Sequence, residues 1–378
     1  MNRGDRWLLL LPLALTAIGV VMVYSSSAIL GITRYQDPNY FLTRQLLRAA
    51  LGVIVLLACA RIDLGKLEAA APVLLGVSVA LLVLVSAAGH ASNGATRWLK
   101  LGFLTLQPTD VARLSAVLFL ARWLKRHPPA ELGWVRGLMP PLLIVGGLSG
   151  LIVAQPNLSS ASLLLAVGFL MLFLAGTPLR HLAAPVIAGG LAAAITLHAR
   201  PYMLDRFQSF VRFAASGGLD PRGSGWQLDQ SLIAIGSGGW FGRGLGGGLQ
   251  KYLFLPEPHT DFIFSILGEE LGFLGTSLLL ALLGLLLWRG LRAAMRATDA
   301  FAFLLAAGLT AQLGLYALAN LAVATGLAPT TGLPLPFVSY GGSALIVNLA
   351  AAGLLYRVSA SNGAMEALAR HRWSREGA

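Results

Sequence analysis

Five ionisable residues are concentrated where a long polar segment meets an apolar one. Glu257, His259 and Asp261 lie within five positions, and Glu269 and Glu270 follow about two helical turns further on. Charged groups at membrane depth are costly and usually mark a functional site. An aspartate here could also cap the next helix. A cap does not require the neighbouring acids and histidine, so we predict an acid–base centre at Asp261.

Two further groups of polar residues flank apolar segments. Arg97 precedes Gln107, Asp110 and Arg113, and the last two are three positions apart, a spacing that allows an ion pair on one face of a helix. The other group is the Gly- and Pro-rich stretch 332–343, which ends at Ser343. Irregular backbone next to a membrane span is tolerated where it lines a cavity. We expect these groups to converge with Asp261 on one outward-opening cavity, although a purely structural pair at 110 and 113 is the alternative.

The composition indicates what must position these residues. The chain has 378 residues, of which 56% are hydrophobic and only 12% charged, and its mean hydropathy is +0.72. Soluble domains carry about twice that charged fraction, so we predict an all-α polytopic membrane protein. The single cysteine, Cys59, excludes a disulfide framework. The net charge of +12 comes from residues scattered at helix ends, which favours membrane orientation over nucleic-acid binding.

Ten apolar segments approach the ~20 residues needed to cross a bilayer. They begin near Trp7, Gln45, Leu67, Thr109, Trp134, Leu158, His181, Phe262, Thr298 and Tyr340. Most Arg and Lys residues then fall on the side of the two termini, which predicts cytoplasmic termini and a cytoplasmic tail at 361–378. The long segment 199–260 between the seventh and eighth spans is predicted to lie outside, as is the loop 89–108.

The long outer segment mixes aromatic and basic residues and is expected to lie along the membrane surface. Its glycine-rich part, 236–248, lacks the strand that a dinucleotide-binding fingerprint requires. These glycines either let the backbone bend over a bound headgroup or form a flexible loop.

Taken together, the stretches 93–99, 107–114, 155–159, 230–239, 256–272 and 332–343 resemble the SEDS family of bacterial cell-wall polymerases. The resemblance covers nearly the whole chain, implies one domain over 1–378, and is closer to the division branch than to the elongation branch, which remains the alternative. It implies a multi-pass inner-membrane peptidoglycan glycosyltransferase that acts on lipid II. The catalytic acid of the family falls on Asp261 and its acid–base pair on Asp110 and Arg113. Asn157 stands where many relatives have Asp, and Thr331 where some have Lys.

The implied reaction joins a sugar hydroxyl to the anomeric carbon of a second, lipid-linked sugar. Asp261 would accept the hydroxyl proton, and Arg97, Arg113, Lys251 or a divalent cation, Mg²⁺ or Mn²⁺, would stabilise the leaving pyrophosphate. No other cofactor is expected. The substrate-binding set that we predict consists of Arg97, Gln107, Asp110, Arg113, Lys251, His259 and Ser343.

The resemblance also implies protein partners. These are a class B penicillin-binding transpeptidase with a single transmembrane helix and other membrane proteins of the division or elongation machinery, with no nucleic acid.

Two other classes of protein fit some of these features. A lipid-precursor flippase would also place polar groups inside a bundle of spans, but the polar groups here gather on the outer side. A silent scaffold would account for the small residues Ala302, Ala306, Thr310 and Gly314, which suit close helix packing. Packing inside the molecule explains the same series without a partner.

Overall fold

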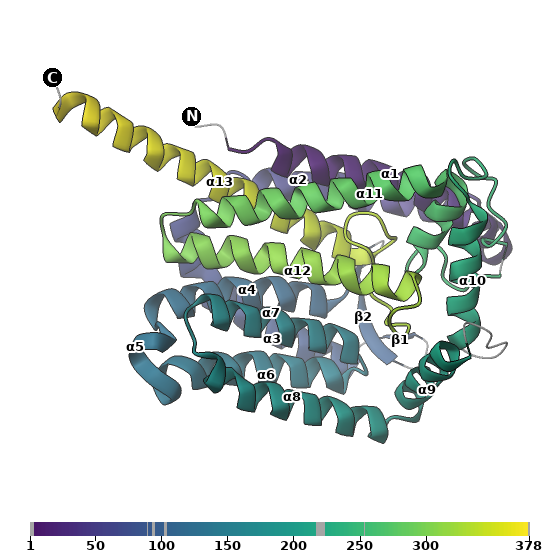
Figure 1. Cartoon of the computed structure of the whole chain (residues 1–378), viewed down its shortest axis with the longest axis horizontal. Coiled ribbons are helices and arrows are strands. Elements are labelled where there is room, and N and C mark those ends of the chain that lie inside the picture. The colour runs from purple at the N-terminus through teal and green to yellow at the C-terminus, as the bar shows by residue number, and fades with distance from the viewer. Residues whose placement is uncertain are drawn as a thin grey trace.

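The computed structural model describes residues 4–376, apart from 89, 93–94, 102–103, 217–223 and 253. Asn93 and Gly94 of the sequence pattern therefore lie outside the described residues. The fold is a bundle of long helices with a small sheet at one end (Figure 1). The helices are α1 (Trp7–Tyr35), α2 (Tyr40–Cys59), α3 (Leu64–Ala88), α4 (Pro108–Arg126), α5 (Pro129–Gly133), the π-helical turn η1 (Trp134–Leu138), α6 (Met139–Ala154), α7 (Leu158–Leu174), α8 (Leu179–Ala199), α9 (Pro201–Ala215), α10 (Ser224–Ser237), α11 (Ile263–Met295), α12 (Ala300–Ala324) and α13 (Gly342–Glu376).

Eight helices in the described part of the chain are long and apolar enough to cross a membrane. They are α1, α2, α3, the continuous helix Trp134–Ala154, α8, α11, α12 and the first part of α13. The two other predicted spans are also helices, but α7 has only 17 residues and α4 carries five charged side chains. The structure therefore supports a polytopic membrane protein, with α4 and α7 differing from the rest in polarity and length.

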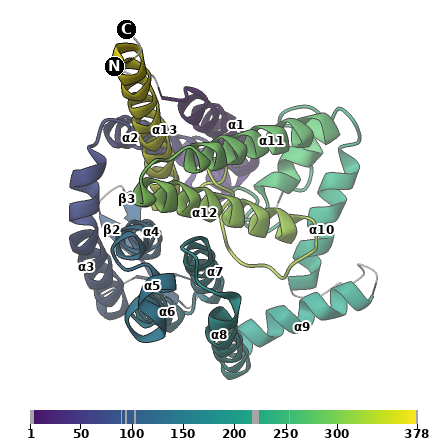
Figure 2. The same ribbon diagram turned by 60° about the vertical axis from the view of Figure 1, so that its left-hand side comes forward.

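Helix α12 lies at the centre of the bundle and contacts α4, α7, α10, α11 and α13 (Figure 2). Its four small residues, Ala302, Ala306, Thr310 and Gly314, are all buried inside the molecule. A Cβ atom on Gly290 of α11 would lie 2.4 Å from the hydroxyl of Thr310, so these two helices pack at close range. The small-residue series serves packing within the chain, and nothing on it supports the scaffold interpretation.

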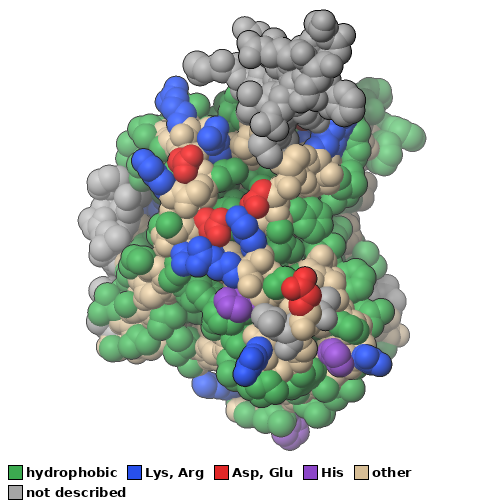
Figure 3. All heavy atoms as spheres, turned by 90° about the vertical axis from the view of Figure 1, so that its left-hand side faces the viewer, with side chains coloured by type: hydrophobic (Ala, Val, Ile, Leu, Met, Phe, Trp, Pro, Cys, Tyr) green, Lys and Arg blue, Asp and Glu red, His purple; other side chains and the backbone are tan. Residues whose placement is uncertain are grey.

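The two ends of the bundle differ. The strands, α9 and α10 gather at one end, and α5 and the termini lie at the other (Figure 1). Figure 3 shows the terminal end, where Lys and Arg side chains alternate with acids. Ion pairs there include Lys125 with Glu68 at 2.9 Å and Arg289 with Asp5 at 3.1 Å. The termini therefore share a side of the bundle, as an even number of spans requires.

The predicted outer loop 89–108 contains short strands. They are β1 (His90–Ser92), β2 (Ala95–Leu101) and β3 (Leu104–Leu106). They pair antiparallel in the order β1-β2-β3, with Leu99 opposite Leu106. Strand β2 carries Arg97, and β3 leads directly into α4, which Pro108 starts at its first position. The sheet thus fixes the position of Arg97 and of the start of α4, which carries Asp110 and Arg113.

Candidate active site

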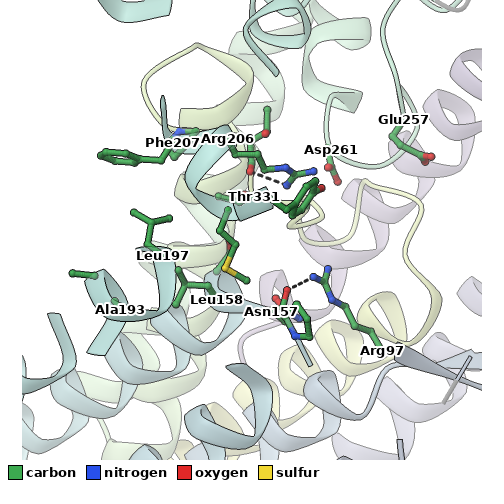
Figure 4. Close-up of a pocket in the computed structure, with 18 of the residues that line it drawn as sticks. Arg97, Asn157, Leu158, Ala193, Leu197, Arg206, Phe207, Glu257, Asp261 and Thr331 are labelled. Carbon is green, nitrogen blue, oxygen red and sulfur yellow. Dashed lines mark hydrogen bonds between the residues drawn. The ribbon is translucent and has the colours of Figure 1, made fainter. Parts of the chain in front are cut away.

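Asp261 lies in the turn that precedes α11, and its carboxylate lines a cavity of 450 Å³ (Figure 4). The N-cap of α11 is Phe262, which makes no side-chain cap hydrogen bond. The capping interpretation of Asp261 is therefore wrong. The other walls of the cavity come from β2, the start of α7, α8, α9 and the loop segment 329–332. The carboxylate faces a space bounded by five separate parts of the chain.

Two arginines face this cavity. Arg206 of α9 donates a hydrogen bond to the carbonyl of Thr330 at 3.0 Å, and Arg97 of β2 donates to the carbonyls of Gln155 and Pro156. Figure 4 shows Arg206 on the same side as Asp261 and Arg97 facing it. Carbonyl contacts hold both guanidinium groups without neutralising their charge. The cavity is therefore suited to an anionic group.

Burial raises the pKa of Asp261 to about 6, and the negative charge of Glu257 adds to this effect. The charge of Arg206 and a hydrogen bond from Thr260 oppose the increase in pKa. Most of the carboxyl group is still ionised at pH 7. A group with a pKa near the working pH is suited to accept a proton and later release it.

The predicted residues Gln107, Asp110, Arg113 and Ser343 meet one another but do not line this cavity. The hydroxyl of Ser343 donates to Asp110 at 2.6 Å and accepts the backbone N–H of Gln107 at 2.8 Å. Arg113 lies 3.6 Å from Asp110 and donates to Asn348 at 2.7 Å. The pair that the spacing predicts is present and fully buried. It joins the start of α4 to α13.

Lys251 also lies away from the cavity, so the structure does not bring it together with Asp261, and its predicted contact with the substrate stays a prediction. Its ammonium group is 2.7 Å from Glu270 and 3.3 Å from the hydroxyl of Ser25 on α1. The same carboxylate accepts hydrogen bonds from Ser25. Glu269 accepts the backbone N–H groups of residues 249 and 250. These acids hold the glycine-rich loop onto α11.

The glycines of this loop permit close contact between backbones, in contrast to the predicted headgroup contact. Helix α11 kinks at Gly272, where φ is 65°. The carbonyls of Glu269 and Glu270 then accept the backbone N–H groups of Arg243 and Gly244, both at 3.0 Å. A Cβ atom on Gly242 would lie 2.1 Å from the carbonyl oxygen of Glu270. The loop is therefore bound along its length to α11.

His259 is buried between aromatic rings, and the structure does not place it in the cavity. Its ring centroid is 4.6 Å from that of Phe41 and 5.3 Å from that of Tyr340. Burial lowers the pKa of His259 to about 4. The ring is neutral at pH 7 and cannot serve as a cation for a phosphate. The structure gives His259 a packing position between these rings, and its predicted substrate contact stays a prediction.

The sequence patterns did not identify Arg206 as a site residue. It is one of several basic residues in the long outer segment, and only the fold of α9 brings it to the cavity of Asp261. The one local signal is Tyr202, four positions earlier, whose ring stacks under the Arg206 guanidinium at 4.6 Å. Asn157 and Thr331 also line the cavity.

In the described part of the chain, no three His, Cys, Asp or Glu side chains lie close enough to hold a metal ion. Asp261 and Glu257 are the only acids among the described residues that line the cavity. The side chains present do not form a protein metal site, and we derive no step through Mg²⁺ or Mn²⁺.

A multi-span helical bundle with a buried carboxylate and two arginines at one end defines a class: polytopic membrane proteins with a charged cavity at one end of the bundle. Residues 6–363 match the family model described as FtsW/RodA/SpoVE, cell cycle protein. The chain belongs to this family.

The relatives span the whole chain. A protein named probable peptidoglycan glycosyltransferase FtsW, from Thioalkalivibrio sulfidiphilus, is 43% identical over 94% of this chain and 90% of its own length. Stage V sporulation protein E of Bacillus subtilis is 38% identical over 94% of this chain and 96% of its own.

Two solved structures have the same fold. A chain from a study of the structural coordination of polymerization and crosslinking by a peptidoglycan synthase complex is 33% identical, with a TM-score of 0.77, over 95% of this chain and 98% of that one. Rod shape determining protein RodA of Thermus thermophilus is 32% identical, with a TM-score of 0.69, over 94% and 96%.

Proposed function

We propose that this chain is a peptidoglycan glycosyltransferase of the division branch, which polymerises lipid II with Asp261 as the general base. The observation that carries the proposal is the buried carboxylate of Asp261 in a cavity that also holds Arg97 and Arg206. The relatives named FtsW support the activity and the division role. The domain covers 1–378, with 199–260 as the outer segment and 361–378 as the cytoplasmic tail.

Each group in the cavity has a task in this reaction. The hydroxyl oxygen of one sugar attacks the anomeric carbon of another, and its proton passes to the Asp261 carboxylate. The bond from that carbon to the pyrophosphate oxygen breaks, and the electron pair leaves with the pyrophosphate. Arg97 and Arg206 stabilise the charge that develops there. One base and two cations are sufficient for a single displacement with inversion.

The lipid part of the substrate also finds a place. An apolar groove of 660 Å³ lies between α6, α7 and α8. Leu158 and Ala193 line both this groove and the cavity of Asp261, so the two are adjacent. A polyprenyl chain in the groove would bring its pyrophosphate to the side of the cavity that holds these residues. An apolar groove next to a charged cavity favours an enzyme for a lipid-linked sugar.

The proposal includes the place of the chain in the cell. Helices α4 and α7 complete ten spans in the bacterial inner membrane, with both termini in the cytoplasm and the Asp261 cavity outside. The charges of α4 are tolerated because Asp110 and Arg113 pair inside the bundle. The partner is a class B penicillin-binding transpeptidase with one transmembrane helix, which would cross-link the new strand. The solved peptidoglycan synthase complex supports this pairing.

The test is polymerisation of purified lipid II in detergent by wild type and by Asp261→Asn, without nucleotide. The substitution keeps the size of the side chain but removes the proton acceptor, and we expect a fall in rate of roughly 10²–10⁴-fold. Normal polymer yield from folded Asp261→Asn protein would disprove the assignment. Lipid II scrambling in liposomes, with no polymer from wild type, would favour the flippase.

A further inference from the structure

The backbone carbonyls of Asp261 and of the two residues before it accept hydrogen bonds from other parts of the chain. The carbonyl of His259 accepts the backbone N–H of Tyr340 at 2.8 Å, and the carbonyl of Thr260 accepts the hydroxyl of Ser339 at 2.6 Å. The carbonyl of Asp261 itself accepts the side-chain amide of Asn320 at 2.9 Å. Three consecutive carbonyls are therefore fixed by α12 and by the loop 329–341.

Asn320 makes the most informative of these contacts. Its side chain, on α12, is 1% exposed. The same nitrogen donates to the carbonyl of Leu333 at 2.8 Å. Because both partners are carbonyl oxygens, only the amide nitrogen can occupy this position. One side chain thus ties the residue that carries the carboxylate to the loop that lines the cavity beside it.

That loop also positions Arg206, whose charge acts on Asp261. Its Thr330 carbonyl accepts the hydrogen bond from Arg206, and Gly332 places its backbone beside Asp261, where a Cβ atom would lie 3.8 Å from the carboxylate. The distance between base and cation therefore depends on how the loop is attached to the 259–261 segment. Asn320 and Ser339 make that attachment.

The buried network of α4 holds the other end of the same loop. Ser339 accepts the backbone N–H of Leu335 at 2.8 Å, and four positions later Ser343 binds Asp110. Asp110 and Ser343 do not line the cavity, yet they fix the point where the loop enters α13. Asp110 and Ser343 would therefore affect the reaction through the position of the loop.

We propose that Asn320 is a positioning residue, which sets the place of the Asp261 carboxylate by binding the Asp261 carbonyl and the 329–341 loop together. The inference rests on the proposed function, because it concerns the same base. A displacement of about 1 Å at a reacting group costs on the order of 10²-fold in rate. Loss of the Asn320 amide should therefore act on the chemical step more than on substrate binding.

The experiment compares Asn320→Leu with Gln312→Leu. Gln312 is a buried amide on the same helix, 1% exposed, and its side chain has no hydrogen-bond partner within the described residues. The kcat and KM of lipid II polymerisation and the melting temperature are measured for both variants. We expect kcat to fall on the order of 10²-fold in Asn320→Leu, with a much smaller change in KM. Gln312→Leu should retain the wild-type kcat.

If Asn320→Leu does not fold, two further variants test the positioning role of Asn320. Asn320→Asp keeps the shape but turns an oxygen toward two carbonyls, and should lose activity to the same degree. Ser339→Ala removes one of the three carbonyl contacts and should lower kcat on the order of tenfold, the equivalent of one hydrogen bond.

Normal kcat in Asn320→Asp and Ser339→Ala, or an equal loss in Gln312→Leu, would overturn the positioning role while leaving the enzyme assignment intact. The proposed function fails separately if wild type makes no polymer or Asp261→Asn is fully active, and the positioning role then fails with it.

Discussion

A substitution at Lys251 can distinguish between two roles for this residue, binding the substrate and holding the glycine-rich loop through its ion pair with Glu270. Its ammonium group lies 2.7 Å from Glu270, and the two side chains are 4% and 0% exposed. Lys251→Met would leave the Glu270 carboxylate buried with only the Ser25 hydroxyl beside it. Removing one member of a buried pair costs roughly 3–5 kcal/mol. Opening of the glycine-rich loop should therefore become on the order of 10²–10⁴-fold more frequent, at 1.4 kcal/mol for each factor of ten.

Hydrogen exchange at the amides of 243–250 measures that opening, and thermal unfolding measures the stability of the bundle. Lys251→Met should exchange faster at these amides, melt earlier and lose polymerase activity in proportion. The double variant Lys251→Met/Glu270→Leu removes both charges. Because replacing a buried pair by apolar residues is often neutral or stabilising, it should recover stability and activity together.

A different result would show that Lys251 binds the substrate. If Lys251→Met protein keeps the wild-type melting temperature and exchange rates but makes no polymer, and the double variant is inactive as well, Lys251 contacts the substrate. The structural account of this ion pair would then be refuted.

Three more outcomes follow from the site. Because burial raises the pKa of Asp261 to about 6 and the base must be ionised, kcat/KM should be half-maximal near pH 6 and fall about tenfold per unit below it. Arg206 lowers the pKa of Asp261, so Arg206→Ala should move that acid limb to higher pH and also reduce kcat. Arg113→Ala should lose both stability and activity, since it leaves Asp110 without its cation. Arg113→Lys should lose less of either, because it keeps the charge but not the guanidinium hydrogen bond to Asn348; melting temperatures and rates on the same samples check this.

The bundle was largely predictable because bilayer thickness imposes a length and an apolar composition on every span. Helix α1 begins at the predicted Trp7, and α11 begins one residue after the predicted Phe262. The local pair Asp110 and Arg113 was predictable for a similar reason, since helical spacing alone brings them together.

The composition of the site was less predictable, because its residues meet through tertiary packing. Lys251 and Arg206 are both basic residues of the same outer segment, and apart from Tyr202 one helical turn before Arg206 their sequence neighbourhoods do not distinguish them. The fold directs Lys251 to Glu270 and Arg206 to Asp261. The short strands around Arg97 also escaped prediction, because three-residue strands β1 and β3 give too little alternation to detect.

The contacts around Asp261 also bear on how the protein is made. Asn320, Ser339, Tyr340 and Ser343 are all synthesised after Asp261 and its helix. When α11 leaves the ribosome, the carbonyls of 259–261 have no partners from these later segments. The lining of the cavity is complete only after the loop segment 329–332 has been made, and the contacts from Ser339 and Tyr340 come later still. The segment that carries the base is therefore among the last parts of the fold to gain all of its contacts.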